Sequence, residues 1–244
     1  MEMELNKVYL GDCLELMKDI PDKSIDMILC DLPYGTTACK WDTIIPFEPL
    51  WEQYKRIIKD NGAIVLTASQ PFTSALVMSN VDWYRSSLVW LKNKPMNFMN
   101  ANKMFMKWHE DIVIFYNKLP TYNPQKIKGK LHKNGNTQNT GNITQYTVGT
   151  QRIITESDTY HPKSILEFKI DHLTKHPTEK PVALFEYLIK TYTNEGDLVL
   201  DNCAGSGTTG VACKNLGRNY ILIEKEPEYV KIINERLSDL KKTR

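Results

Sequence analysis

The sequence has no hydrophobic run long enough to cross a membrane. Its longest apolar stretches, such as residues 112–116, have only the length of a strand. The N-terminus, Met-Glu-Met-Glu-Leu-Asn-Lys, has no basic segment followed by an apolar one, which is the pattern of a secretory signal. These absences predict a cytoplasmic protein with no membrane partner.

The sequence also lacks the patterns of a disulfide framework or a metal site. Its cysteines are odd in number and form no C-x-x-C pair, so we expect reduced thiols that serve mainly in packing. His109-Glu110 does not continue to H-E-x-x-H, and His172 with His176 has no cysteine companions. We therefore expect no bound metal. The five cysteines are Cys13, Cys30, Cys39, Cys203 and Cys213.

A large net charge is absent as well, since the formal value is +2. The charge is nevertheless unevenly distributed. Between Lys118 and Lys163 there are seven basic residues and two acidic ones, which gives this segment a net charge of +5. Such a local excess favours a polyanionic partner, although solvated lysines on a surface loop are the alternative interpretation.

Strand-like and helix-like segments alternate along most of the chain, which predicts an α/β fold. The strand-like segments are nearly continuous apolar runs, as expected for a mostly parallel sheet buried on both faces. We expect strands at 24–30, 63–67, 87–92, 111–116, 198–200 and 220–223, and helices at 47–59, 182–193, 208–216 and 227–241. Residues 118–165 are instead polar and show no helical period, which indicates a long loop-rich insertion.

A glycine loop lies between two of the expected strands and opens a helix. Gly205, Gly207 and Gly210 satisfy G-x-G-x-x-G, and Glu224 ends the following strand. Glycines let a backbone approach a nucleoside, and an acidic side chain accepts its ribose hydroxyls. An NAD enzyme is disfavoured, because the 34 residues after Gly210 cannot supply a dinucleotide fold. Asp201 would repel a pyrophosphate but could accept from an ammonium group, which favours S-adenosylmethionine.

A second motif, Asp31-Leu32-Pro33-Tyr34, follows the first buried strand. An exocyclic amine of a base is a poor nucleophile, because its lone pair is delocalised into the ring. The Asp31 carboxylate and the Leu32 carbonyl could bond its two N–H groups and free that lone pair. Pro33 would stiffen the loop, and Tyr34 would stack on a flipped base. The alternative is a turn capped by Asp31 with Tyr34 buried beneath it.

Together the two motifs resemble the permuted, beta-class group of S-adenosylmethionine-dependent DNA amino-methyltransferases, the N6-adenine/N4-cytosine DNA methylase family. The resemblance covers nearly the whole chain. It includes the segments 9–15, 108–115, 176–181, 201–207 and 217–224. The sequence departs from the family pattern at Leu32, where proline is usual, at Asn202-Cys203, which replaces Pro-Phe, and at Glu179, which replaces glutamine.

The resemblance implies a three-layer αβα fold, with a mostly parallel, seven-stranded, Rossmann-like sheet and a target-recognition insertion. The single methyltransferase domain, 1–244, would comprise a catalytic half at 1–117, the insertion at 118–165 and a cofactor-binding half at 166–244. The implied reaction is methyl transfer from S-adenosylmethionine to adenine N6 in double-stranded DNA. Cytosine N4 is the alternative, because only Asp31 in place of serine favours adenine. A catalytically inactive DNA-binding relative is the alternative from another class.

The resemblance also implies roles for individual residues. The catalytic ones are Asp31, Leu32, Pro33 and Tyr34, and the DNA-binding candidates are Trp41, Lys126, Lys128 and Lys130. The cofactor-binding ones are Asp12, Cys13, Thr178, Lys180, Asp201, Ala204, Gly205, Ser206, Gly207 and Glu224. Asp12 could instead simply end a strand, and Thr178 and Lys180 could cap the next helix. A homodimer and a partner restriction endonuclease are further expectations.

Overall fold

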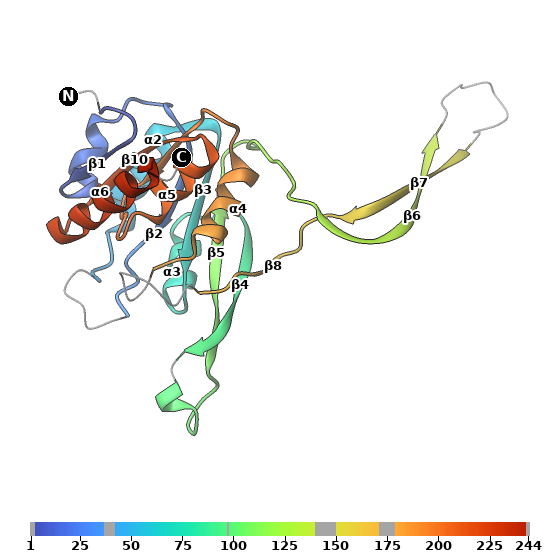
Figure 1. The fold of residues 1–244 in the computed structure, drawn as a ribbon, viewed down its shortest axis with the longest axis horizontal. Coiled ribbons are helices and arrows are strands. Elements are labelled where there is room, and N and C mark those ends of the chain that lie inside the picture. Colours follow the sequence, from blue (N-terminus) through green and yellow to red (C-terminus); the bar gives the residue numbers. More distant parts are fainter. Residues whose placement is uncertain (1–2, 37–41, 97, 140–149, 171–178, 243–244) are drawn as a thin grey trace. The chain divides into compact units, whose positions relative to one another are not determined.

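The chain forms two compact units in the computed structural model, which describes residues 3–36, 42–96, 98–139, 150–170 and 179–242. The first unit comprises residues 1–123 and 164–244, and the second comprises residues 124–163. The predicted insertion, at 118–165, therefore contains the whole of the second unit. Figure 1 shows the elements of each unit.

A mixed sheet forms the centre of the first unit and confirms the predicted α/β class. Its strands, in spatial order, are β1 (Lys7–Leu10), β10 (Asn219–Glu224), β9 (Leu198–Asp201), β2 (Ile25–Asp31), β3 (Ile58–Ala68), β5 (Lys107–Phe115), β4 (Tyr84–Met96) and β8 (Ile165–Glu167). Neighbours pair in parallel except at β5, which is antiparallel to β3 and β4. The expected number of seven strands is wrong for the described residues, because the short β8 adds an eighth at the edge beside β4.

Helices cover both faces of this sheet, as the three-layer prediction requires. One face carries α1 (Cys13–Leu16), α2 (Phe47–Ile57) and α3 (Phe72–Ser79), and the other carries α4 (Val182–Tyr192), α5 (Thr208–Leu216) and α6 (Pro227–Lys242). Alternate residues of β2 face the two layers. Ile28 packs in the core with Tyr54 of α2, whereas Leu29 packs in the core with Leu188 of α4. No helix of the described residues is long and apolar enough to span a bilayer.

The direction of the strands decides which side chains can meet. Because β1, β2, β3, β9 and β10 are mutually parallel, their carboxyl ends lie along one edge of the sheet. The reversed strand β5 places its first residues at the same edge, where Asp111 pairs with Ala68 of β3 and Glu110 pairs with Trp90 of β4. Because β4 is antiparallel to β5, its later residues reach this edge as well, so residues from seven strands converge here.

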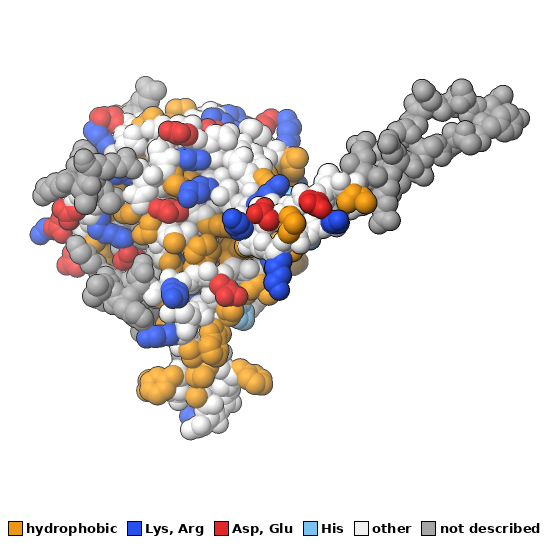
Figure 2. Space-filling view, turned by 45° about the vertical axis from the view of Figure 1, so that its right-hand side comes forward, with side chains coloured by type: hydrophobic (Ala, Val, Ile, Leu, Met, Phe, Trp, Pro, Cys, Tyr) orange, Lys and Arg blue, Asp and Glu red, His pale blue; other side chains and the backbone are white. Residues whose placement is uncertain are grey.

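The hairpin of β4 and β5 extends beyond the sheet and carries exposed apolar side chains near its tip. The 3-10 turn η2 (Phe98–Asn100) lies in this connection, and a second one, η1 (Met17–Asp19), follows α1. Figure 2 shows hydrophobic side chains gathered at this end of the unit. Those more than half exposed are Phe98, Met99, Met104 and Phe105.

The second unit consists of a long antiparallel hairpin, β6 (Ile127–Asn139) and β7 (Thr150–Tyr160). The expectation of an irregular loop at 118–165 is therefore wrong for the residues of these two strands. The two strands are mostly polar, and their few apolar residues, such as Leu131 and Ile154, are exposed. They therefore lack the apolar alternation that would indicate strands. Within the hairpin, the ring of His132 stacks on Tyr160 with centroids 4.3 Å apart, and Tyr160 donates to the Lys130 carbonyl.

Candidate active site

A cavity of about 450 Å³ opens at the carboxyl edge of the sheet, within the size range of small-molecule sites. Segments that are far apart in the sequence line it together. They include both predicted motifs and the turn after β1. Among the lining residues are Asp12, Cys13, Asp31, Leu32, Pro33, Tyr34, Lys180, Gly205 and Glu224. The structure thus brings nine of the predicted site residues to one cavity.

Asp31 is the last residue of β2, and hydrogen-bond donors surround its carboxylate. Oδ1 accepts from the hydroxyl of Tyr34 at 2.7 Å and from the hydroxyl of Thr67, the register neighbour of Asp31 on β3. Oδ2 accepts from Nζ of Lys180 at 2.5 Å. These contacts come from three separate parts of the chain, so the orientation of the carboxylate is determined by the tertiary fold. We expect such a carboxylate to be held rigidly.

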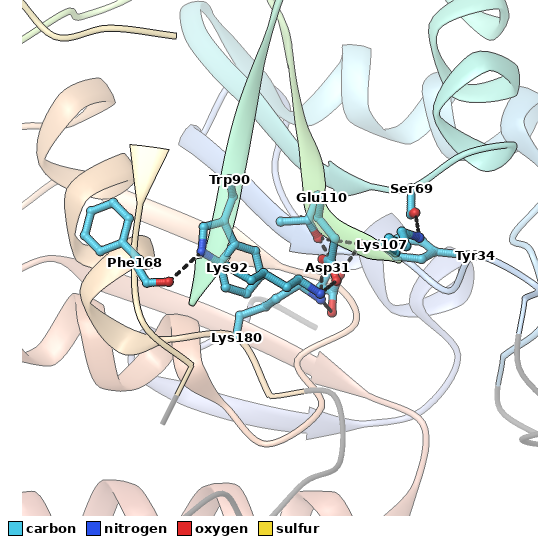
Figure 3. A network of polar contacts seen from close by, with 10 residues as sticks. Asp31, Tyr34, Ser69, Trp90, Lys92, Lys107, Glu110, Phe168 and Lys180 are labelled. Atoms are coloured by element: carbon cyan, nitrogen blue, oxygen red, sulfur yellow. Dashed lines mark hydrogen bonds and ion pairs between the residues drawn. The ribbon is translucent and has the colours of Figure 1, made fainter. Parts of the chain in front are cut away.

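Two lysines flank a second carboxylate, Glu110, at the start of β5 (Figure 3). Oε1 accepts from Nζ of Lys92, and Oε2 lies 3.4 Å from Nζ of Lys180. Burial alone would raise the pKa of Glu110, but the charges of Lys180 and Lys92 lower it below the ordinary value. Likewise, burial opposes the charged form of Lys180, yet Asp31 and Glu110 raise its pKa. The side chains of Asp31, Lys180, Glu110 and Lys92 therefore form a series of alternating negative and positive charges in the cavity.

Lys107 and Tyr34 complete this part of the cavity. Nζ of Lys107 donates to the hydroxyl of Ser69, and burial lowers the pKa of this lysine. The ring of Tyr34 stacks on Phe72 of α3 with centroids 5.3 Å apart. Burial, together with the neighbouring carboxylates of Asp31 and Glu110, raises the pKa of Tyr34, so its hydroxyl remains a donor at neutral pH.

The glycine loop and Glu224 form the other side of the cavity. Glu224, the last residue of β10, accepts from the Gly205 amide at 2.7 Å and from the Glu226 amide at 2.8 Å. Gly205 has a φ of +51° and no atom within 4 Å of the position that a Cβ would occupy. A side chain there would enter open space at the cavity and strain the backbone. Glycine thus leaves room beside the Glu224 carboxylate.

The buried carboxylate of Asp201 stabilises this loop through hydrogen bonds. Oδ2 accepts from the Thr209 hydroxyl at 2.5 Å, and Oδ1 accepts from the Cys203 amide at 3.1 Å. Burial raises the pKa of Asp201 to about 7, against the opposing effect of the Thr209 hydrogen bond. The structure does not place Asp201 among the cavity residues, so the predicted contact with an ammonium group would require this carboxylate to become accessible.

The remaining predicted residues lie elsewhere. Ala204, Ser206 and Gly207 belong to the glycine loop but do not line the cavity. Asp12 lines it and also caps α1, because its Oδ1 accepts from the Leu14 amide at 2.9 Å. Trp41 and Thr178 lie outside the described residues. Lys126, Lys128 and Lys130 are exposed in the second unit.

Comparisons with known proteins agree with this geometry. The family model described as DNA methylase matches residues 25–235, which is most of the chain. The chain belongs to the DNA methylase family. Among its relatives, the Type II methyltransferase M.HinfI of Haemophilus influenzae is 29% identical, with 97% of this chain and 69% of the relative covered. M2.MboI of Moraxella bovis is 28% identical, with 96% and 88% covered.

Solved structures place the methylase in the same fold. The M1.HpyAVI–SAM complex is 27% identical, with a TM-score of 0.64 and coverage of 95% of this chain and 99% of that chain. The cytosine-N4-specific PvuII DNA methyltransferase has a TM-score of 0.67 at 16% identity, covering 98% and 92%, which indicates a shared fold alone. The methylase is thus an S-adenosylmethionine-dependent enzyme that methylates amino groups of DNA.

The residues of the cavity fit this cofactor. A nucleoside needs an acceptor for its ribose hydroxyls and a backbone that it can approach closely. The Glu224 carboxylate fits the first requirement, and Gly205, whose amide donates to Glu224, fits the second. Burial raises the pKa of Glu224, but its backbone donors favour the charged form. A cationic methionine end would find a carboxylate in the same cavity, that of Asp12. The cofactor prediction is confirmed.

Cavity residues of the methylase that were absent from the predicted site residues include Lys92, Lys107 and Glu110. Thr67, which does not line the cavity but donates to Asp31, was absent as well. Thr67 ends an apolar run whose partner strand cannot be read from the sequence. His109 and Glu110 are neighbours in the sequence, but only Glu110 lines the cavity, whereas His109 is exposed to solvent. The alternation of a strand explains this difference.

Proposed function

We propose that the methylase transfers its methyl group to N6 of adenine, at a base that is flipped out of double-stranded DNA. The observation that carries the proposal is the Asp31 carboxylate, held between Tyr34, Thr67 and Lys180 at the cavity wall. Among amino-methyltransferases that the sequence resembles, aspartate at this position is typical of adenine enzymes and serine of cytosine-N4 enzymes. Cytosine N4 is the second candidate, because its amine offers the same two N–H donors.

The chemistry assigned to these residues follows from their hydrogen-bonding capacity. Asp31 and the Leu32 carbonyl accept the two N–H groups of the amine, which directs its lone pair away from the ring. Tyr34 and the proline after Leu32 restrict the loop that presents both acceptors. When bound, S-adenosylmethionine supplies an electrophilic methyl group. The methylated nitrogen then loses a proton, and its hydrogen bond to Asp31 provides the route.

The second unit is the proposed DNA contact. Lys126, Lys128 and Lys130 are exposed. Lys126 directly precedes β6, and Lys128 and Lys130 lie near its start. Three ammonium groups at this spacing can contact the phosphates of a duplex. Contacts of this kind position a protein on DNA without reading the base sequence. We expect polar residues between 134 and 145 to contact base edges, a range that lies partly outside the described residues.

A homodimer and a partner restriction endonuclease belong to the same proposal. The exposed Phe98, Met99 and Phe105 at the tip of β4–β5 support self-association, because solvated apolar clusters mark interfaces. Sedimentation of the wild type and of Phe105→Ser checks this, and a wild-type mass of only 28.2 kDa at micromolar concentration would refute the dimer.

Relatives named Type II methyltransferases suggest a nuclease partner. A DNA substrate implies the compartment that holds DNA, which in a bacterium is the cytoplasm.

The decisive experiment is base-resolved sequencing of DNA from cells that express the protein. Adenine-N6 methylation at one recurring site is the expected result, and cytosine-N4 methylation would select the second candidate. Asp31→Asn should abolish methylation yet keep cofactor affinity, since this carboxylate acts on the amine. Lys59→Met is the matched control, because Lys59 pairs with Asp26 near the opposite end of β3. Absence of methylation on adenine N6 would refute the proposal.

A further inference from the structure

Lys180 lies closer to the catalytic carboxylate than its predicted role as a cofactor ligand requires. Its side chain is only 6% exposed, and its Nζ lies 2.5 Å from Oδ2 of Asp31. The same Nζ lies 3.4 Å from Oε2 of Glu110 (Figure 3). One buried ammonium group therefore stands between two carboxylates, nearer to one of them. Taking an ammonium group out of water is costly unless such partners are present.

The lone pairs of Asp31 show where a target amine can bind. A carboxylate oxygen accepts about two hydrogen bonds, and Oδ1 already has the hydroxyls of Tyr34 and Thr67 within reach. Oδ2 has one donor, Lys180, among the described residues. An amine that enters the cavity must therefore bond to Oδ2, the same oxygen that Lys180 occupies.

Glu110 offers a second place for the ammonium group. Its Oε2 is buried and makes no hydrogen bond within the described part of the chain, although Lys180 lies at ion-pair distance. The other oxygen, Oε1, accepts from Lys92, which anchors the side chain. A buried carboxylate oxygen without a hydrogen bond is unfavourable, so a small movement of Nζ toward Oε2 would satisfy it.

We propose that Lys180 is a positioning residue that moves from Asp31 to Glu110 when the target amine binds. Before the base arrives, Lys180 balances the charge of Asp31 and orients Oδ2. When the amine donates to Oδ2, the ammonium group forms its hydrogen bond with Oε2 of Glu110 instead. The proposal rests on the role of Asp31 proposed above, and it applies equally to adenine N6 and cytosine N4.

The charge that moves during methyl transfer explains why this movement would help. The reaction carries a positive charge from the sulfonium centre to the amine, which is the group bonded to Asp31. An ammonium group held against the same oxygen would oppose that charge. With Lys180 paired to Glu110, the negative charge of Asp31 is left to stabilise the amine as it becomes cationic. Lys92 keeps Glu110 in place for this purpose.

Steady-state kinetics over a range of pH tests the proposal, together with calorimetry of S-adenosylmethionine. Lys180→Met should lower kcat by about tenfold or more near pH 6 and move the acidic limb of the pH–rate profile upward, because the cation that stabilises the charged carboxylates of the cavity is removed. Cofactor affinity should stay within about twofold of the wild type. Lys180→Arg should restore part of kcat, and Lys59→Met serves as the control.

The double variant Lys180→Met/Glu110→Gln distinguishes this role from a purely structural one. Removing the second carboxylate as well should return the acidic limb toward its wild-type position. If the two substitutions only damaged the structure, their effects would add and the limb would not return. Glu110→Gln alone should lower kcat with little change in KM for DNA, and it tests the proposal even if Lys180→Met does not fold. A Lys180→Met enzyme with a wild-type pH profile but weakened cofactor binding would overturn the proposal. An active Asp31→Asn enzyme would instead refute the role of Asp31.

Discussion

Replacing Asp201 with asparagine should change how the stability of the methylase depends on pH. Asp201 is buried, and its pKa is raised from an ordinary 3.8 to about 7. Between these pH values the folded state binds a proton that the unfolded state releases, so stability falls as the pH rises through this window. At about 1.4 kcal/mol for each pH unit, the ionised carboxylate costs on the order of 4 kcal/mol above pH 7.

Asparagine removes the charge but keeps an oxygen for the Cys203 amide and offers an N–H group to the Thr209 hydroxyl. The difference in unfolding free energy, Asp201→Asn minus wild type, should therefore rise by about 1.4 kcal/mol per pH unit from about pH 4 to about pH 7 and then level off. Urea denaturation of the cofactor-free protein, followed by tryptophan fluorescence, measures this difference. Asp22→Asn, at an exposed position, is the control. A difference that does not vary with pH would refute the reasoning.

Two further predictions concern the cofactor and DNA. Glu224→Ala removes the acceptor of the Gly205 amide and should weaken binding of S-adenosylmethionine by about 1–3 kcal/mol in calorimetry; an unchanged Kd would exclude Glu224 from the site. Replacing Lys126, Lys128 and Lys130 with alanine should weaken binding to all DNA sequences alike. It should also reduce the log–log salt slope by about 3, at about 0.9 for each lost phosphate contact. A wild-type slope would place DNA binding elsewhere in the chain.

Most of the fold of the first unit could be predicted because its elements carry strong periodic signals. The apolar runs at 24–30 and 220–223 are β2 and β10, and the helical pattern at 208–216 coincides with α5. Shorter elements had no such signal. β8 is three residues long, with a single buried side chain, and it is recognisable only by its pairing with β4. The hairpin β6–β7 has backbone hydrogen bonds but no buried side chain among those that the structure describes, so hydrophobic periodicity could not reveal it.

The candidate site was predictable where a local motif contains its own chemistry. Asp31 to Tyr34 and the loop around Gly205 lie on contiguous segments, and both line the cavity. Lys92 and Thr67 are different, because each matters only through a partner on another strand. Thr67 is an ordinary strand residue until its register with Asp31 is known. Charges within expected strands, such as Lys92, also resemble solvated surface residues until burial is determined.

The reversal of β5 shows why topology, and not composition, completes this site. Had β5 run parallel to β3, its first residues would lie at the opposite edge of the sheet, and Glu110 could not approach Lys180. Register matters equally. Neighbouring residues of a strand face opposite sides, so a shift of β5 by one residue would present His109 or Asp111 to the cavity in place of Glu110, depending on its direction. A histidine there could not balance Lys92 and Lys180, and two buried ammonium groups would share one carboxylate, Asp31. The antiparallel pairing of Glu110 with Trp90 is therefore as necessary to the charge balance of the site as the residues themselves.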